Sequence, residues 1–178
     1  MVEEVILVDE LDNSIGTMEK MEAHEKAILH RAFSVFVFNN KGEMLLQQRA
    51  INKYHSGGLW TNSCCSHPKP NEKTLEAAAR RLKEEMGFET DLFKVFDFIY
   101  KAPFSNGLTE YEFDHVFIGK YNGTIVPNKD EVANYEYISL ENIEQQLINE
   151  PSKYTEWFKI AFPKVKEYWL LQKKLNDE

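Results

Sequence analysis

Short apolar runs bounded by turn-forming residues dominate the first half of the chain, and this pattern predicts strands. Glu4–Val8 is the first such run, and Leu11–Gly16 follows it as a predicted turn. Ala32–Phe38 is dense in phenylalanine and valine, and Glu43–Gln48 continues extended after the tetrapeptide Asn-Asn-Lys-Gly. Because Asn and Gly adopt the backbone angles that a tight turn needs, we expect these two runs to form a β-hairpin.

The apolar spacing becomes helical over Asn71–Met86. The residues that recur at intervals of three and four, and that are expected to share the buried face, are Leu75, Ala78, Ala79 and Leu82. Gly87 is suited to end this helix, because glycine tolerates the left-handed conformation found at helix C-termini.

Further strands are predicted after this helix. Asp91–Lys101 and Glu110–Lys120 are expected to pair through a turn at Pro103–Gly107, because Pro and Gly mark the segment between two extended runs. Tyr135–Ile138 is predicted as another short strand. Up to residue 138, the chain is therefore predicted to consist mostly of strands, with one helix.

The last part of the chain has helical spacing over Leu140–Asn149 and Thr155–Leu175, the second with an expected break near Pro163. Strands mixed with few helices predict an α+β fold, an α/β/α sandwich whose mixed sheet is flanked by helices. With 178 residues and no linker or repeat, residues 1–178 are expected to form a single domain.

Composition narrows the functional classes. The formal net charge of −8 argues against a general nucleic-acid-binding surface, which needs a basic face, but it leaves room for a small basic pocket. The apolar runs are too short to span a bilayer, and the first residues lack the pattern of a secretion signal. Adjacent Cys64 and Cys65 predict no disulfide framework. We therefore expect a cytoplasmic protein, a monomer or weak dimer, without membrane or nucleic-acid partners.

Imidazoles and carboxylates from separate segments form a candidate metal-binding set: His24, His30, His67, Glu110 and Glu112. Glu110 and Glu112 are two apart on a predicted strand, so both project from one face. Nitrogen and oxygen donors of this kind suit Mn²⁺, Mg²⁺ or Zn²⁺, and the sequence does not choose among them. His55 and His115 are interpreted as ordinary histidines without a site role.

Cys65 stands two residues before His67 and is a candidate proton donor or acceptor. A free cysteine has a pKa of about 8.5, which nearby cations or a metal lower and an apolar pocket raises. Glu112 is the second candidate for proton transfer, because a bound ion would tune its proton affinity. Cys64, by contrast, is expected to be a small buried packing residue.

Aromatic and basic residues complete the candidate site. Tyr100 and Trp157 could line a pocket with π-faces that stabilise a cation. The basic residues that lie near these motifs, and that as a set could bind a diphosphate, are Lys20, Arg49, Lys53 and Arg81.

The segment from Glu72 to Phe88 resembles the Nudix box, which has Gly, five residues, Glu, seven residues, and then Arg-Glu-apolar-x-Glu-Glu-x-Gly-apolar. The positions that match are Glu72, Arg80, Glu84, Glu85, Gly87 and Phe88. Ser66 stands where the first Gly would be, and Arg81 stands where a metal-binding Glu would be. The missing carboxylate argues against diphosphate hydrolysis while leaving a ligand for one Mg²⁺.

The wider pattern resembles the type I isopentenyl-diphosphate isomerase family, the metal-dependent form with a Nudix fold. The matching segments are His24, His30–Ser34, Leu45–Arg49, Thr61–Pro68, Arg80-Arg81 with Glu85, Tyr100, Glu110–Glu112 and Trp157–Lys159. The segment Asn-x-x-Cys-x-His-Pro combined with Glu-x-Glu is specific to this family, and the matches span nearly the whole chain in the family's order. The resemblance implies conversion of isopentenyl diphosphate to dimethylallyl diphosphate.

The resemblance also implies a role for each candidate residue. Cys65 and Glu112 would be the catalytic acid–base pair, and Tyr100 and Trp157 would flank a carbocation. One divalent ion would be held by His24, His30, His67, Glu110 and Glu112. A Mg²⁺ bound to the substrate diphosphate would be held by Glu85 and the backbone carbonyl of Cys65. The diphosphate itself would be contacted by Lys20, Arg49, Lys53 and Arg81.

Two alternatives stay open at the level of sequence. A Nudix hydrolase that cleaves a diphosphate substrate would share the fold but would not require the Cys/His cluster. A non-enzymatic zinc module could use Cys64, Cys65, His67 and an upstream histidine, although adjacent cysteines lack the regular spacing of zinc fingers.

Overall fold

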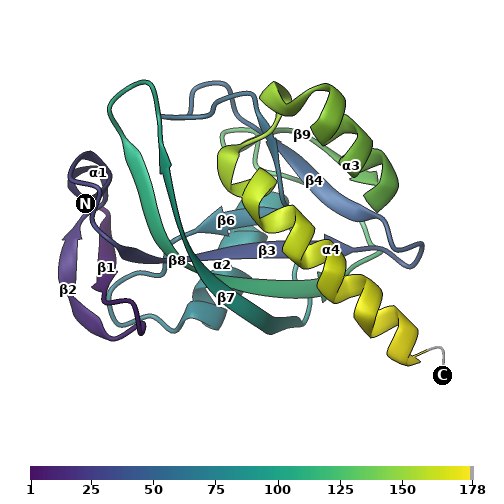
Figure 1. Ribbon diagram of the computed structural model, residues 1–178, viewed down its shortest axis with the longest axis horizontal. Coiled ribbons are helices and arrows are strands. Elements are labelled where there is room, and N and C mark those ends of the chain that lie inside the picture. The colour runs from purple at the N-terminus through teal and green to yellow at the C-terminus, as the bar shows by residue number, and fades with distance from the viewer. Residues whose placement is uncertain (177–178) are drawn as a thin grey trace.

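The strand β3 (His30–Phe38) lies at the centre of a nine-stranded mixed sheet in the computed structural model, which describes residues 1–176 (Figure 1). The other strands are β1 (Glu4–Val8), β2 (Ser14–Glu19), β4 (Met44–Arg49), β5 (Trp60–Thr61), β6 (Cys64–Ser66), β7 (Leu92–Pro103), β8 (Thr109–Lys120) and β9 (Val132–Ile138). The helices are α1 (Lys20–Glu25), α2 (Thr74–Met86), α3 (Leu140–Asn149) and α4 (Glu156–Asn176), with a 3-10 turn at Pro151–Lys153.

Four strands pair with β3 and fix its position in the sheet. Along one edge it pairs in parallel with β8, from His30 opposite Glu112 to Phe38 opposite Lys120. Along the other edge it meets β1, β6 and β4 in turn. β8 also pairs with β7 in a long antiparallel hairpin. The sheet therefore brings an imidazole and a carboxylate that are far apart in the sequence directly beside each other.

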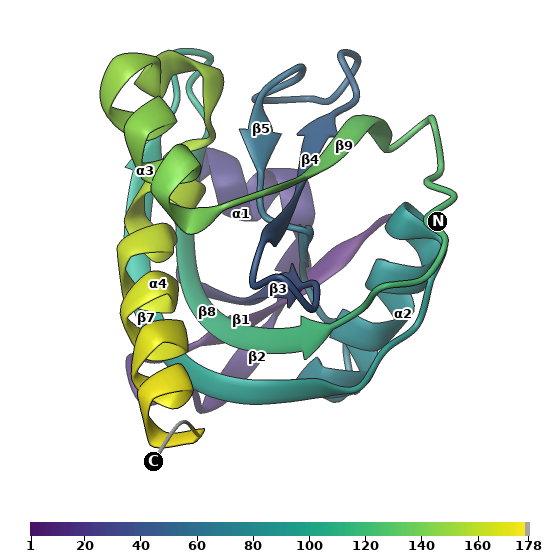
Figure 2. The ribbon, with the colours of Figure 1, turned by 90° about the vertical axis from the view of Figure 1, so that its right-hand side faces the viewer.

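Side chains that alternate along β3 enter two separate cores. Phe33, Val35 and Val37 pack against α2, whereas Phe36 and Phe38 pack against α3 and α4. Figure 2 shows α2 on one side of the curled sheet and α3 and α4 on the other. This arrangement confirms the expected α/β/α layering, which follows from the period of two in a strand that is buried on both faces.

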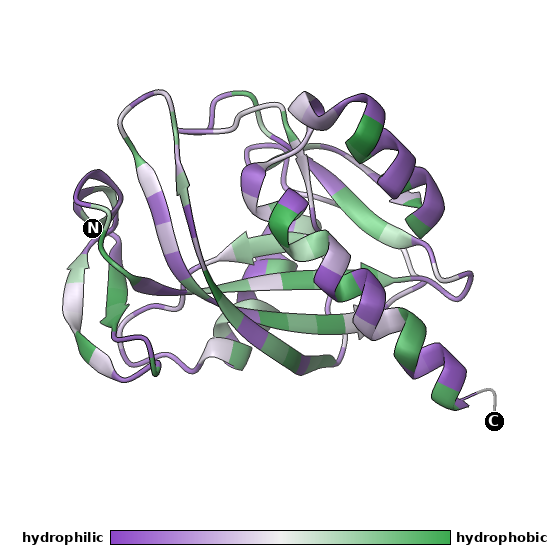
Figure 3. Ribbon diagram, in the orientation of Figure 1, coloured by the Kyte–Doolittle hydropathy of each residue, from purple (hydrophilic) through white to green (hydrophobic). Residues whose placement is uncertain are grey.

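The face of β8 that meets α4 changes character along the strand. Glu110, Glu112 and Asp114 occupy it near α1, whereas Val116 and Ile118 occupy it farther along and join the core under α4. Figure 3 shows the same change from hydrophilic to hydrophobic colours along β8. The polar end of this face is therefore the place where the sheet presents acidic groups to a pocket.

Several predicted elements are confirmed with small shifts. β1 and α3 have the predicted bounds, β7 and β8 match the predicted strand pair to within two residues at each end, and Gly87 ends α2 with φ of 76°. The expected hairpin over Ala32–Gln48 is only partly right. The turn forms, but β3 and β4 pair only at Phe38 and Met44, after which β4 pairs with β9 and β5.

Other predictions are wrong in detail. α2 begins at Thr74 rather than Asn71, and its buried face contains Ala77, Ala78, Leu82 and Met86. Leu75 and Ala79, which were assigned to that face, are exposed. Small alanine side chains toward the sheet let the helix lie close to β3 and β6. The buried face of α2 is therefore rotated relative to the predicted one.

Two further differences concern loops and helix ends. The predicted turn Leu11–Gly16 includes the start of β2, an exposed edge strand that lacks apolar alternation. α4 continues through Pro163 instead of breaking there. Phe158, Phe162 and Val165 lie on both sides of this proline and pack into the same core, which holds the two parts of the helix in line.

None of the helices within residues 1–176 has the length and apolarity to cross a membrane.

Gly87 provides a test of the packing of α2. We expect Gly87→Ala to destabilise the fold by about 3 kcal/mol, because a left-handed alanine costs about 1–2 kcal/mol and overpacking adds about as much. An ideal Cβ at this position would lie 2.0 Å from the backbone oxygen of Val126. Gly107 is a matched control, since its φ is +83° but no atom lies within 4 Å of the added Cβ. Urea unfolding of both variants would measure the difference, and equal losses would contradict the packing argument.

Candidate active site

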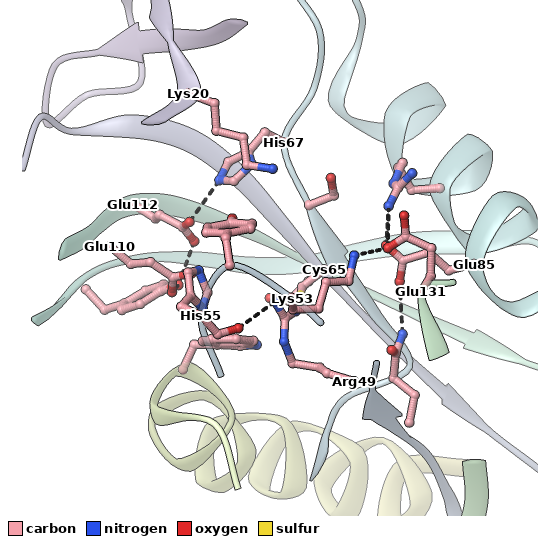
Figure 4. A pocket seen from close by; sticks show the side chains of 17 residues that line it. Lys20, Arg49, Lys53, His55, Cys65, His67, Glu85, Glu110, Glu112 and Glu131 are labelled. Atoms are coloured by element: carbon pink, nitrogen blue, oxygen red, sulfur yellow. Dashed lines mark hydrogen bonds and ion pairs between the residues drawn. The ribbon is translucent and has the colours of Figure 1, made fainter. Parts of the chain in front are cut away.

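One pocket opens at the polar end of the β8 face (Figure 4). The residues predicted from the sequence that line it are Lys20, Arg49, Lys53, Cys65, His67, Arg81, Glu85, Tyr100, Glu110, Glu112 and Trp157. They come from β4, β6, β7 and β8, from α1, α2 and α4, and from the loops after β4 and β6. His24 and His30 do not line the pocket, but they belong to a buried donor cluster beside it.

The donor cluster consists of His24, His30, His67 and Glu112, whose ligand atoms lie within 4.8 Å of one another. His30 Nε2 lies 3.2 Å from His67 Nε2, and His67 Nε2 lies 2.9 Å from Glu112 Oε1. Glu110 is not in this group and instead forms a second one with His24 and His55. The five predicted ligands are therefore close together but do not form a single group.

Backbone carbonyls fix the tautomers of two of these histidines. Nδ1 of His24 donates to the carbonyl oxygen of Lys20 at 2.6 Å, and Nδ1 of His30 donates to that of Ile28 at 2.8 Å. A carbonyl oxygen can only accept, so the proton is on Nδ1 and the lone pair is on Nε2. Within residues 1–176, the buried Nε2 of His24 has no hydrogen-bond partner. An oriented, unpartnered lone pair of this kind fits a metal ligand.

The pKa values of this cluster agree with a cation site. Burial alone would raise the pKa of Glu112, but its hydrogen bonds to His30 and His67 hold that pKa well below its usual range. Burial lowers the pKa of His24, and it lowers the pKa of His67 to about 4. Burial also acts to lower the pKa of His30, but the contact with Glu112 outweighs it and the pKa rises. A divalent ion would replace the proton on His30, because metals bind neutral imidazole.

Tyr100 connects the two acidic groups. Its hydroxyl lies 2.6 Å from Glu112 Oε2 and 2.8 Å from Glu110 Oε2, and it donates its single proton between them. Burial raises the pKa of Tyr100 well above its ordinary value, so the phenol stays protonated. The Oε1 atoms of both glutamates are therefore turned toward the histidines.

The two adjacent cysteines face opposite sides of β6. Cys64 is fully buried in the core beneath α2, in agreement with its predicted packing role. Cys65 lies opposite Ser34 in the antiparallel pairing of β6 with β3. Its side chain faces the pocket and packs with Tyr100 and Trp157. Burial raises the pKa of the Cys65 thiol more than nearby Arg49 lowers it. Cys65 is therefore protonated at neutral pH, while Glu112 is ionised. Neither cysteine belongs to the donor groups found in residues 1–176, so the zinc-module alternative has no support.

Arg49, Lys53 and Arg81 lie at the other end of the pocket, whereas Lys20 lies on the side of His67 (Figure 4). Arg81 pairs with Glu85 at 2.6 Å, and Gln47 Nε2 donates to the second oxygen of Glu85 at 2.9 Å. The guanidinium of Arg49 lies 5.2 Å above the ring of Trp157. Lys53 pairs with Glu131. Cationic groups around a buried carboxylate suit a polyanionic ligand that carries its own metal ion.

His55 lines the pocket although the sequence interpretation gave it no role in the site. It is buried against Phe104, with ring centroids 4.6 Å apart, and it approaches the edge of Trp157 at 5.7 Å. Its Nε2 lies 3.0 Å from Glu110 Oε1. The available signal was its place in the sequence, close after Lys53 in the loop between β4 and β5. His115 instead contacts Asp12 outside the pocket, as expected of an ordinary histidine.

Comparisons with known proteins give a family model and relatives that cover most of this chain. The NUDIX domain model matches residues 28–158. The chain is 50% identical over 166 residues to the isopentenyl-diphosphate Delta-isomerase of Pectobacterium atrosepticum, with 93% of each chain covered. It is 54% identical over 159 residues to isopentenyl-diphosphate Delta-isomerase 2 of Photorhabdus laumondii, with 89% of this chain and 90% of that one covered.

Solved structures show the same fold at low identity. A crystal structure of a Deinococcus radiodurans protein is similar with a TM-score of 0.69 and 19% identity, over 83% of this chain and 90% of that one. The MutT protein of Methanosarcina mazei is similar with a TM-score of 0.64 and 22% identity, over 79% of this chain and 94% of that one. At these identities the likeness concerns the fold alone.

Proposed function

Because this chain carries a NUDIX domain and belongs to the isopentenyl-diphosphate Delta-isomerase family, we propose that its pocket converts isopentenyl diphosphate to dimethylallyl diphosphate. The observation that carries the proposal is that Cys65 and Glu112 line the same pocket. Tyr100 lies between them: its hydroxyl donates a hydrogen bond to Glu112, and its ring belongs to the cluster against which Cys65 packs. A thiol that holds its proton and a carboxylate that has lost its own are suited to exchange protons with one substrate.

The reaction moves a double bond by two proton transfers. One group of the pair adds a proton to C4, which leaves a tertiary carbocation at C3, and the other group removes a proton from C2. The substrate gains one proton and loses one, so no oxidant or reductant is needed. The pair ends each turnover with its protons exchanged between Cys65 and Glu112, and contact with solvent restores the starting state.

The walls of the pocket are suited to the intermediate. The aromatic rings of Trp157 and Tyr100 lie next to Cys65, and aromatic faces stabilise a cation by about 0.5–2 kcal/mol. The ionised carboxylate of Glu112 adds a negative charge in a buried environment, where electrostatic effects are strong. Trp157, Tyr100 and Cys65 pack together on one wall, and a bound substrate that fills the pocket would exclude water, which would otherwise trap the carbocation as an alcohol.

The donor set fits a divalent ion. We propose that Mn²⁺, Mg²⁺ or Zn²⁺ is held by His24, His30, His67, Glu110 and Glu112. This ion would supply a fixed positive charge that tunes the proton affinity of Glu112. A Mg²⁺ that accompanies the diphosphate would be held by Glu85 and the backbone carbonyl of Cys65. The diphosphate would be contacted by Lys20, Arg49, Lys53 and Arg81, which all line the pocket.

The hydrolase alternative is less favourable. Arg81 occupies the position of a Nudix glutamate, and it forms an ion pair with Glu85. A hydrolase needs several carboxylates on that helix to hold the metals that activate water. Here one of them is replaced by a cation and another is partly neutralised by it. The substrate remains a small-molecule diphosphate, and we expect the protein to act as a monomer or weak dimer in the cytoplasm.

Incubation with isopentenyl diphosphate and Mg²⁺ in deuterated water tests the proposal. Because Cys65 and Glu112 exchange their protons with solvent, we expect dimethylallyl diphosphate with deuterium at its new methyl group, detected by NMR. Release of phosphate would support the hydrolase instead. Absence of turnover with the metal-loaded protein would contradict both.

A further inference from the structure

His55 and Glu110 are placed so that both can bind the same metal ion. The exposed fraction of its side chain is 3%, and its Nε2 lies 3.0 Å from Glu110 Oε1. Within the described part of the chain, this buried Nε2 has no partner with hydrogen-bond geometry. Two polar atoms at contact distance without hydrogen-bond geometry between them are suited to face a third atom that binds both.

The separation is the one expected for two ligands of one metal ion. Nitrogen and oxygen ligands lie about 2.0–2.2 Å from such an ion, so neighbours at right angles are about 3.0 Å apart. The same scale occurs in the first donor group, where His67 Nε2 lies 2.9 Å from Glu112 Oε1. His55 and Glu110 therefore have the spacing of adjacent ligands.

One histidine joins the two donor groups. His24 Nε2 belongs both to the group with His30, His67 and Glu112 and to the group with His55 and Glu110. Its Nδ1 donates to the Lys20 carbonyl, so only one lone pair is available and it can serve only one ion. Tyr100 also joins the groups through its contacts with both glutamates. Glu110 belongs to the proposed ligand set, so its neighbour His55 lies beside that set as well.

The loop that carries His55 is held in place from several sides. Arg49 donates to the backbone oxygen of His55 at 3.3 Å, and Phe104 stacks on its ring at an interplanar angle of 13°. Nδ1 of His55 lies 3.2 Å from the Ser56 hydroxyl, which can accept its proton and leave the lone pair on Nε2. Ser56 itself has φ of 53°, which directs the turn of the chain after the histidine. The ring is thus fixed toward the donor cluster.

We propose that His55 is a sixth protein ligand of the divalent ion, together with the five residues named above. The inference rests on the proposed function only in assigning one ion to those five. Four imidazoles and two carboxylates complete a six-coordinate shell and leave no position for a water molecule. A closed shell is typical of ions that position and polarise protein groups, whereas ions that activate water keep a position open. The ion would then hold Glu112 and would not generate a nucleophile.

Binding of Mn²⁺ to the full chain tests this inference without any measurement of activity. We expect His55→Ala and His55→Gln to bind Mn²⁺ at least about 100-fold more weakly than the unmodified protein in competition with a chelator, since loss of an outer partner alone costs about 10–100-fold. Electron spin-echo spectroscopy of the bound Mn²⁺ should count four directly bound imidazoles in the unmodified protein and three in each variant. Circular dichroism checks that the variants are folded.

The controls separate the possible results. His115→Asn removes another buried imidazole, which contacts Asp12, and it should bind Mn²⁺ as the unmodified protein does. Three imidazoles in the unmodified protein, or full affinity in His55→Gln, would overturn the inference and leave His55 as a hydrogen-bond donor to Glu110. If His67→Ala weakens binding while both His55 variants do not, only this inference fails. If the unmodified protein does not bind Mn²⁺, or if His67→Ala binds it unchanged, the ion in the proposed function fails as well.

Discussion

Glu112→Gln should lower kcat by about 10⁴-fold, because it removes both a proton-transfer group and a charge that the buried cluster needs. The ionised carboxylate contacts His67 at 2.9 Å and Tyr100 at 2.6 Å, and glutamine has the same shape but cannot carry the charge. Such a loss corresponds to about 5.4 kcal/mol of transition-state stabilisation. Conversion of isopentenyl diphosphate measured by NMR, with metal content measured in parallel, would give both effects.

The matched control for this variant is Glu136→Gln. Glu136 is an exposed glutamate on β9 that does not line the pocket, so its variant should turn over at the normal rate. Circular dichroism should show both variants folded, because glutamine fills the same space. A rate for Glu112→Gln within about tenfold of the unmodified protein would contradict the role given to this carboxylate, since acid–base groups contribute about 10²–10⁴-fold.

Cys65→Ala is expected to lower kcat by about 10³-fold, with little effect on stability. The thiol lies beside Tyr100 and Trp157 in the pocket, and alanine removes the group that holds the proton while keeping the strand intact. Cys65→Ser should also be strongly impaired, because a hydroxyl gives up its proton much less readily than a thiol. The same NMR assay measures both variants.

The neighbouring cysteine is the natural control for Cys65. Cys64 points to the opposite side of β6 into the core beneath α2. Cys64→Ala should therefore keep near-normal turnover and lose about 1 kcal/mol of stability through reduced packing. If Cys64→Ala abolished turnover while Cys65→Ala preserved it, the orientation of β6 relative to the pocket would be wrong.

The sequence predicted those parts of the site that depend on local spacing. The period of two in a strand put Glu110 and Glu112 on one face, and the motif around Cys65 and His67 indicated the chemistry. Both were found in one pocket, although their individual roles remain predictions. Local spacing does not state which distant strands become neighbours, so the parallel pairing that sets His30 opposite Glu112 was not predicted.

Residues outside regular elements were the hardest to predict. His55 lies in a loop without periodicity, and only the tertiary contacts with Phe104 and Glu110 reveal its position. α1 was missed because it is only six residues long and is capped by Glu19, which is not a favoured capping residue. The break expected near Pro163 was wrong because packing of α4 on the sheet outweighs the local effect of one proline.

The parallel pairing of β3 with β8 has a consequence for the order in which the chain folds. His30 and Glu112 are joined by no tight turn, and the intervening polypeptide contains β4, α2 and β7. Contacts between such distant segments form slowly, because a long loop must first be closed. The donor cluster can therefore form only after nearly all of the chain has folded. An ion that binds there would stabilise only the completely folded protein and would not bind fragments or nascent chains.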